Sequence, residues 1–403
     1  MARKIRCNDA PLLADFSFEL RRKNWVRVGD VNPLSKKMNE GKEGYAQTID
    51  SCGLEECVAK CQEALNYHEL RARYGRKPGE PLPKKVRGIG GAIAMQGSAI
   101  PGVDMGGASI KINDDGSFNL MVGATDLGTG ADTVMAQIAA EVLGVTPQDI
   151  IVYPSDTDLT PFDTGAYASS TTYISGMAVK KAAEEVAYQI CRVAASMLDL
   201  PSPEQVRLHD KKCYAPDGRF VTLEEVALHA LHVRDQRQIM GHASAVSLKS
   251  PPPFAAQFAE VEVDTETGEV RVLRMASAVD CGRAINPILA EGQIEGAATQ
   301  ALGYGHCEEM VWDEQGRMLT RDLRDYKIYE AWEMPRMYTF LVEPHDPHGP
   351  FGAKAVAEVP TDAMAPAIAN AVAHALGIRI RSIPLTPERV LRAIREAEGA
   401  AVR

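Results

Sequence analysis

The sequence predicts an α+β fold in which mixed sheets carry packed helices. Several segments repeat apolar residues at the spacing of a helix, and others alternate apolar and polar residues about turn signals, as strands do. These segments do not follow one another in a regular strand–helix–strand order, and no internal repeat occurs. With 403 residues, 45% of them apolar, the chain is long enough for two domains, or for one domain and part of another.

The first 85 residues are expected to form a lead-in with a single helix over residues 53–67. The lead-in ends in the Pro- and Gly-rich linker Lys77–Pro83, which is the best candidate for a domain boundary. We therefore expect the chain to divide into residues 1–85 and residues 86–403.

The overall charge and the cysteines exclude several classes of protein. A net charge of -10 without any Lys/Arg tract is not typical of nucleic-acid binding, and no apolar run reaches the length of a membrane span. Eight cysteines in a chain without a secretion signal favour free thiols in a cytoplasmic protein. Cys57 and Cys61 share one face of the expected helix, and with Cys52 they lack the spacing of ferredoxin clusters. Core packing is therefore favoured over an iron–sulfur ligand.

Beyond residue 86, strands and helices are expected in irregular order. The turn signal Asn113–Gly116 predicts a hairpin within residues 107–123. The other strands are expected over residues 150–153, 258–264 and 270–275, the last two paired across a short turn. Helices are expected over residues 133–143, 176–198, 295–306 and 363–376, the last one entered through Pro366 and ended at Gly377.

Three glycine-rich turns are candidates for an anion-binding cradle: Asp126–Gly130, Thr164–Thr172 and Asn286–Gly296. A turn before a helix presents unpaired backbone N–H groups to an anion, although such turns also need glycine for structural reasons alone. The second turn contains four successive hydroxyl residues, Ser169–Thr172. Because a helix cap needs only one hydroxyl, this run favours phosphate binding over capping.

Glu358 is the candidate for a general base. Its neighbours Ala357 and Val359 are small or apolar, so the carboxylate is expected to be partly desolvated, which suits a proton acceptor. The structural alternative is a salt bridge with Lys354, four residues earlier. Gln293 is a second candidate, because its amide can donate and accept hydrogen bonds toward a heterocycle; by itself it would be taken for a surface glutamine.

Five segments of the sequence resemble, in the same order, the C-terminal half of the molybdenum subunit in the xanthine dehydrogenase/aldehyde oxidase family. They are Asp126–Gly130, Asp156–Pro161, Ala166–Gly176, Asp280–Gly296 and Gly352–Glu358. The resemblance extends over nearly the whole chain, from Glu19 to Pro387.

The resemblance implies a molybdopterin cofactor, in its cytosine dinucleotide form, with molybdenum held through the pterin and by no protein ligand. It implies that residues 1–85 complete an upstream part of the molybdopterin-binding region and that residues 86–403 form the molybdopterin-binding domain with the catalytic glutamate, Glu358. The residues that it assigns to the cofactor are Leu127, Gly128, Thr129, Gly130, Ala168, Ser169, Ser170, Thr171, Thr172 and Gln293.

The activity that the resemblance implies is hydroxylation of an N-heterocycle, a purine such as xanthine, with oxygen derived from water. Glu358 would accept a proton in this reaction, and the electrons would leave through 2Fe–2S clusters and FAD on partner subunits. The alternatives are a relative that acts on an aldehyde or an aromatic acyl-CoA, and a non-catalytic scaffold subunit.

The sequence departs from the family pattern at several positions. Thr129 stands where the family usually has glutamine, Ser170 where many members have arginine, and Ala355 and Ala357 where many have glycine. The chain also corresponds only to the second half of the family's large subunit. A separate subunit carrying the first half, within a heteromeric complex, is therefore expected as a partner.

Overall fold

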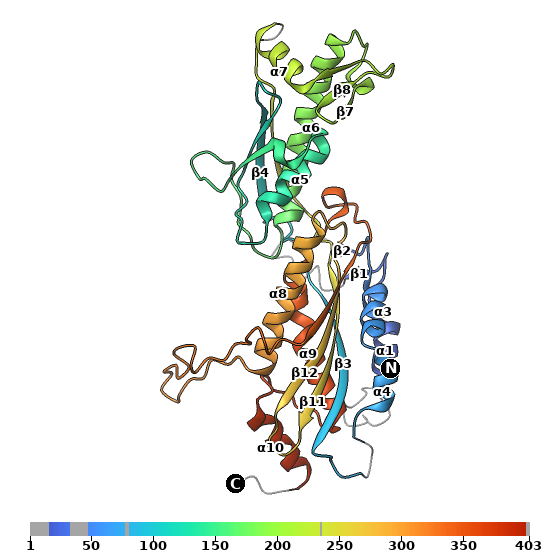
Figure 1. Cartoon of the computed structure of the whole chain (residues 1–403), viewed down its shortest axis with the longest axis vertical. Coiled ribbons are helices and arrows are strands. Elements are labelled where there is room, and N and C mark those ends of the chain that lie inside the picture. Colours follow the sequence, from blue (N-terminus) through green and yellow to red (C-terminus); the bar gives the residue numbers. More distant parts are fainter. Residues whose placement is uncertain (1–15, 33–46, 77–79, 234–235, 400–403) are drawn as a thin grey trace.

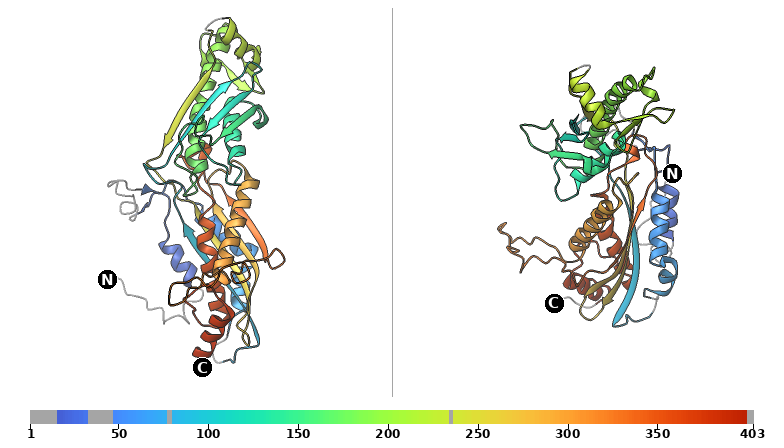
Figure 2. Two further views of the ribbon diagram at one scale, coloured as in Figure 1. Left: turned by 90° about the vertical axis from the view of Figure 1, so that its left-hand side faces the viewer. Right: turned by 45° about the horizontal axis from the view of Figure 1, so that its top comes forward.

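The molecule is elongated, with two lobes stacked along its longest axis (Figures 1 and 2). This computed structural model describes residues 16–32, 47–76, 80–233 and 236–399. Residues 105–246 form what we call the upper lobe. The other described residues form the lower lobe, so the chain passes from the lower lobe to the upper one and back.

The helices and strands of the described residues have the following bounds. The helices are α1 (Phe16–Asn24), α3 (Leu54–Ala64), α4 (Tyr67–Arg73), α5 (Ala131–Leu143), α6 (Thr171–Met197), α7 (Leu223–His232), α8 (Pro287–His306), α9 (Val359–Leu376) and α10 (Pro387–Ala397). The strands are β1 (Val31–Asn32), β2 (Gln47–Thr48), β3 (Lys85–Met95), β4 (Met105–Ile112), β5 (Phe118–Val122), β6 (Ile150–Pro154), β7 (Arg207–His209), β8 (Lys212–Tyr214), β9 (Phe220–Thr222), β10 (Met240–Val246), β11 (Phe254–Asp264), β12 (Val270–Asp280) and β13 (Arg336–Val342).

The lower lobe is a four-stranded sheet in the order β13-β12-β11-β3, covered by helices on both faces. Strands β11 and β12 pair antiparallel, as the sequence predicts, whereas β12 and β13 run parallel. Phe258 packs toward α3 on one face, and Val261 packs toward α8 and α9 on the other. Because both faces are covered, nearly all of β11 is buried instead of every second residue.

Strand β3 was not predicted from the sequence, because its glycines interrupt the apolar pattern. They allow the backbones of β3 and α9 to approach closely. A Cβ atom on Gly88 would lie 2.1 Å from the carbonyl oxygen of Ala371, and one on Gly90 would lie 2.2 Å from the nitrogen of Ala371. No residue with a side chain fits there without displacing α9.

The upper lobe contains a second four-stranded sheet, in the order β10-β4-β5-β6, with α5 and α6 packed against it. The predicted hairpin is confirmed as β4 and β5, with Ile112 opposite Phe118. Strand β6 then pairs parallel to β5 after α5. The small sheet β7-β8-β9 and helix α7, neither of which was predicted, lie at the far end of this lobe.

Three predicted helices begin earlier than their apolar periodicity indicates. Helix α6 begins at Thr171, α8 at Pro287 and α9 at Val359. The first turn of α8 is largely exposed, whereas Tyr173 and Ile174 of α6 and Val359 of α9 are buried apolar residues that the expected ranges leave out. Pro366, expected at the start of α9, lies inside it, and Pro360 occupies the first turn instead.

Helix α3 packs directly on the sheet of the lower lobe. Cys57 and Cys61 are fully buried among the apolar side chains between α3 and β11, which confirms core packing for these two residues. The division of the chain at residue 85 stays a prediction, and residues 77–79 of the expected linker lie outside the described residues. Among the helices described here, none is long and apolar enough to cross a membrane.

Candidate functional site

A cavity of about 250 Å³ lies where the two lobes meet, and its lining joins segments that are far apart in the sequence. The sequence-predicted site residues that line it are Leu127, Thr129, Ser169, Thr171 and Thr172 from the upper lobe and Gln293 and Glu358 from the lower lobe. The remaining predicted residues, Gly128, Gly130, Ala168 and Ser170, lie in the same turns but do not line the cavity.

In the first turn, Asp126–Gly130, a carboxylate of the turn itself binds the backbone N–H groups. The carboxylate of Asp126 accepts hydrogen bonds from the backbone N–H groups of Gly128, at 2.8 Å, and Gly130, at 3.1 Å, and a longer one from Asp132. Burial alone would raise the pKa of Asp126, but these backbone donors outweigh it and hold the pKa below its usual value. The expectation that this turn offers free N–H groups is therefore wrong, and Thr129 presents its side chain instead.

The second turn is held in an unusual backbone conformation. Ala168 and Ser169 have positive φ angles of 50° and 56°, a region that residues other than glycine seldom occupy and that is often found at functional sites. The hydroxyl of Ser169 accepts a hydrogen bond from the backbone N–H of Glu358, at 3.0 Å. Ser170 is buried, and its hydroxyl donates to the carbonyl oxygen of Tyr167 at 2.9 Å. Thus Ser169 connects the two lobes beside Glu358, whereas Ser170 stabilises the turn.

The third segment is a helix and not a turn. Helix α8 begins directly after Asn286, whose side-chain oxygen accepts a hydrogen bond from the N–H of Leu289 at 3.1 Å. The amide nitrogen of Asn286 also donates to Gln137 of α5, at 3.2 Å, across the junction of the lobes. Gln293, expected before the helix, lies inside α8 and faces the cavity.

Glu358 is the residue directly before α9, at the rim of the cavity. Its carboxylate contacts the side-chain amide of Gln96, which follows β3. The side chain is exposed in this chain, so the expected partial burial of Glu358 is wrong here: its small neighbours leave the carboxylate uncovered. The alternative salt bridge with Lys354 is also wrong, because Lys354 pairs with the buried carboxylate of Asp280.

Two residues of this site escaped the sequence analysis for different reasons. Gln96 is 262 residues from Glu358 in the sequence, and no local pattern marks it. The capping role of Asn286 could have been found, because Asn followed by Pro287 is a typical helix start.

The cavity lining suits a cofactor that carries phosphate and pterin oxygen and nitrogen atoms. Within the described part of the chain, the hydroxyl groups of Thr129, Thr171 and Thr172 and the amide of Gln293 make no hydrogen bond to the protein. The side chain of Arg283, which also lines the cavity, makes a single 3.9 Å ion pair, with Glu343, among the residues that the structure describes. These side chains are therefore free to donate hydrogen bonds to a bound anionic cofactor.

Comparison with known proteins agrees with this geometry. Residues 60–335 match the family defined as molybdopterin cofactor-binding domain. The chain is 36% identical over 378 residues to an Escherichia coli K12 protein named probable hypoxanthine oxidase, covering 93% of this chain and 39% of that protein. It is 34% identical to the xanthine dehydrogenase molybdenum-binding subunit of Escherichia coli O157:H7, covering 92% of this chain and 48% of the other.

A solved structure shares the fold over almost the whole chain. Reconstituted CO dehydrogenase from Oligotropha carboxidovorans superposes with a TM-score of 0.84 at 27% identity, covering 96% of this chain and 50% of that one. The chain thus spans about half, or less, of the length of the proteins that it matches. It belongs to the family of molybdopterin cofactor-binding domains, in the molybdenum-binding subunits of the xanthine dehydrogenase type.

Proposed function

We propose that this chain is the catalytic, molybdopterin-binding part of a multisubunit hydroxylase that acts on an N-heterocycle, a purine such as xanthine, with oxygen derived from water. The observation that carries the proposal is the position of Glu358. Its exposed carboxylate stands at a cavity that is also lined by Thr171 and Thr172, whose hydroxyls make no hydrogen bond to the described residues of the chain.

Some residues of the chain bind the cofactor, and Glu358 transfers a proton. A bound molybdenum cofactor would supply the two-electron oxidising chemistry of this site. Thr129, Thr171, Thr172 and Gln293 donate hydrogen bonds to it. Glu358 accepts the proton that is released as oxygen derived from water is transferred to the substrate.

The surroundings of Glu358 keep it ready for this role. It precedes α9, so its negative charge lies at the positive end of the helix dipole. Its backbone N–H is held by Ser169, and its carboxylate is in contact with the amide of Gln96. Both contacts restrict the positions that the carboxylate can adopt, and a fixed base needs less reorganisation during the reaction.

The purine substrate, the cytosine dinucleotide form of the cofactor and the further subunits belong to this proposal. The names of the two Escherichia coli relatives, a hypoxanthine oxidase and a xanthine dehydrogenase subunit, support a purine. The half-length coverage supports a partner that supplies the remainder of the molybdenum-binding region. We place the 2Fe–2S clusters and FAD on other subunits of a cytoplasmic complex.

A second candidate function is supported by the fold. The likeness to CO dehydrogenase, at a TM-score of 0.84, favours oxidation of a different small molecule at the same kind of centre. An aldehyde or an aromatic acyl-CoA is the corresponding alternative among organic substrates, and a cofactor-holding scaffold is the alternative without catalysis.

One experiment separates these functions. The purified complex is analysed for molybdenum and then assayed with an artificial electron acceptor against purines, aldehydes, aromatic acyl-CoA esters and CO. We expect about one molybdenum per chain and turnover of a purine, with ¹⁸O from labelled water in the product. Turnover confined to another class would replace the substrate, and a complex without molybdenum would support the scaffold.

A further inference from the structure

A fully buried ion pair lies beneath the cavity. The ammonium nitrogen of Lys354 is 2.6 Å from a carboxylate oxygen of Asp280, and both side chains are inaccessible to solvent. Lys354 also donates to the carbonyl oxygen of Pro252 at 3.1 Å and lies over the ring of Phe254. Removing two charges from water is costly, and apolar residues of similar volume often give equal or greater stability. The pair therefore calls for an explanation other than stability.

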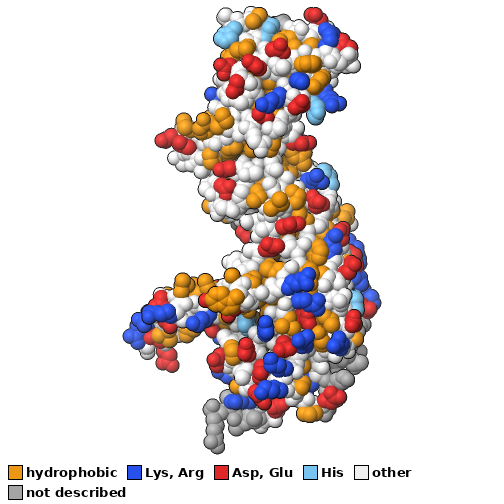
Figure 3. Space-filling view, in the orientation of Figure 1, with side chains coloured by type: hydrophobic (Ala, Val, Ile, Leu, Met, Phe, Trp, Pro, Cys, Tyr) orange, Lys and Arg blue, Asp and Glu red, His pale blue; other side chains and the backbone are white. Residues whose placement is uncertain are grey.

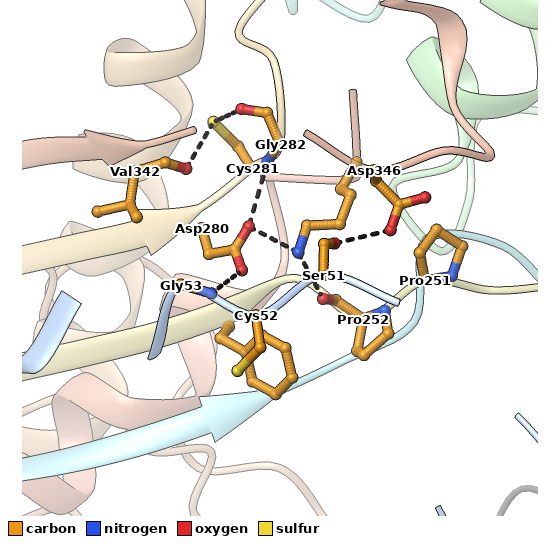
Figure 4. Close-up of polar contacts among 12 residues, drawn as sticks. Ser51, Cys52, Gly53, Pro251, Pro252, Asp280, Cys281, Gly282, Val342 and Asp346 are labelled. Carbon is orange, nitrogen blue, oxygen red and sulfur yellow. Dashed lines mark hydrogen bonds and ion pairs between the residues drawn. The ribbon is translucent and has the colours of Figure 1, made fainter. Parts of the chain in front are cut away.

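The pair joins three segments of the chain at one point, and Figure 4 shows the contacts of Asp280 with Gly53 and Gly282. Asp280 is the last residue of β12 and accepts hydrogen bonds from the N–H groups of Gly53, at 2.7 Å, and Gly282, at 3.2 Å. Gly53 directly precedes α3. Lys354 lies four residues before Glu358 in the same segment. The carboxylate of Asp280, which the sheet and α3 hold in place, therefore anchors the segment that leads to the candidate base.

The backbone around Lys354 is tied to the same place. The N–H of Lys354 donates to the carbonyl oxygen of Cys281 at 2.8 Å, and the N–H of Arg283 donates to that of Gly352 at 2.9 Å. The N–H of Ala355 donates to the hydroxyl of Ser98 at 3.0 Å. Residues 352–355 therefore form a short paired stretch against the end of β12, and the ion pair lies directly under it.

We propose that the ion pair of Asp280 and Lys354 is a positioning device for Glu358. It fixes the register of residues 352–355 against β12, because any slip of this segment would separate a buried ammonium group from its carboxylate. An apolar pair of the same volume would fill the space equally well but would tolerate such a slip. The inference rests on the proposed role of Glu358 as the base.

The test removes both charges together. In the double variant Asp280→Asn with Lys354→Met, no buried charge remains unpaired, and the asparagine oxygen can still accept from Gly53. We expect a melting temperature and a molybdenum content close to those of the wild-type complex. We expect kcat to fall at least tenfold at unchanged KM, because small misplacements of a reacting group cost large factors in rate.

A matched control uses another ion pair of the same sheet. Glu260 and Arg274 pair at 2.5 Å between β11 and β12, and neither lines the cavity. The double variant Glu260→Gln with Arg274→Met removes a charge pair from this sheet without touching residues 352–358. Its kcat should stay within about twofold of wild type, whatever its melting temperature.

A second measurement does not depend on turnover. Hydrogen–deuterium exchange in the complex should be at least tenfold faster at the amides of residues 352–355 in the Asp280/Lys354 double variant, with β11 unchanged. The single variant Lys354→Met, in which the buried Asp280 can take up a proton and so leaves no unpaired charge, should show a comparable increase and serves if the double variant does not fold. Wild-type kcat together with wild-type exchange would overturn the proposal. If exchange rises but the wild-type complex turns over no substrate, the positioning role stands and the proposed function fails.

Discussion

At the scale of single residues, Glu358 combines two properties that a general base needs: an accessible carboxylate and a fixed backbone. Accessibility follows from its place at the cavity rim, and the backbone is fixed by the hydrogen bond to Ser169. Glu358→Gln keeps the size of the side chain but cannot accept a proton. We expect turnover to fall at least about a hundredfold, with molybdenum content unchanged.

The control for this variant is Glu295→Gln. Glu295 is an exposed carboxylate of α8 that lies outside the cavity lining. Its rate should stay within about twofold of wild type in the same steady-state assay. A rate for Glu358→Gln within tenfold of wild type would exclude Glu358 as the base.

The hydroxyl groups of Thr171 and Thr172 are the second point at residue scale. They line the cavity without a protein partner in the described chain, so their replacement removes donors only from a bound ligand. The variant Thr171→Val with Thr172→Val should lower the molybdenum and pterin content of the purified complex several-fold, while KM in the loaded fraction changes less than about threefold.

Ser170 provides the comparison for the threonine pair. Its hydroxyl is used inside the turn, where it donates to Tyr167. Ser170→Ala should therefore lower the melting temperature without lowering cofactor content at saturating supply. Full cofactor content in the threonine variant, combined with a tenfold increase in KM, would place these hydroxyls in the substrate pocket.

Residues of the candidate site could be predicted where a local pattern in the sequence marks them. The run Ser169–Thr172 is visible because four hydroxyl residues are adjacent, and Glu358 because its neighbours are small. Gln96 and the pair of Asp280 and Lys354 could not be found, because each contact is made by residues far apart in the chain. The exposure of Glu358 was mispredicted because the size of sequence neighbours does not determine what covers a side chain in space.

At the scale of elements, the packing of β3 against α9 depends on the absence of side chains. Gly90 faces the backbone of α9, where a Cβ atom would come within 2.2 Å of the nitrogen of Ala371. Gly90→Ala must therefore push α9 away from the sheet. We expect a loss of about 1–3 kcal/mol in the free energy of unfolding, the usual range for overpacking, measured by chemical denaturation of the complex.

Gly296→Ala is the matched control for Gly90→Ala. Gly296 lies in α8, and a Cβ atom there would meet no other atom within 4 Å. Because alanine has the higher helix propensity, this change should leave stability unchanged or raise it by up to about 1 kcal/mol. If both substitutions had the same effect on stability, the close packing of β3 and α9 would not be the cause.

Elements were predictable where a regular apolar pattern or a turn signal marks them. The periodicity of α5 and the hairpin of β4 and β5 are plain in the sequence, and both were found. Strand β3 was missed because its glycines, which allow α9 to pack closely, interrupt the alternation of apolar and polar residues. The start of α8 was misplaced because its first turn is largely exposed and carries little of the apolar face on which periodicity depends, whereas Tyr173 and Ile174 at the start of α6 are buried and were overlooked.

At the scale of the whole molecule, the segment of residues 308–335 between α8 and β13 projects from the lower lobe (Figure 1). The space-filling view shows apolar and charged side chains along this arm, with a hollow between the arm and the upper lobe (Figure 3). Trp332 is 81% exposed and Leu323 is 73% exposed. Apolar side chains this exposed are typical of a surface that a partner covers.

We therefore predict that the chain expressed alone is aggregated or free of cofactor. Co-expression with a polypeptide equivalent to the remainder of its relatives' molybdenum-binding subunit should yield a loaded complex. Size-exclusion chromatography with metal analysis measures both properties. A monodisperse, molybdenum-loaded single chain would contradict this prediction.

Two variants test the arm itself. Trp332→Ser with Leu323→Ser should make the lone chain more soluble and weaken its association with the co-expressed partner at least tenfold. Tyr188→Ser removes a side chain of α6, in the upper lobe, that is 56% exposed. This control should change neither solubility nor association by more than about twofold.

The carboxylate of Asp126 has a consequence for the order of assembly. Because it satisfies the backbone of the Asp126–Gly130 turn from within, this part of the binding surface keeps its shape before any cofactor arrives. The cofactor then meets a wall that is already in its final form, and little ordering entropy is lost at that turn on binding. This turn can therefore reach its final form while the chain folds, before a cofactor binds.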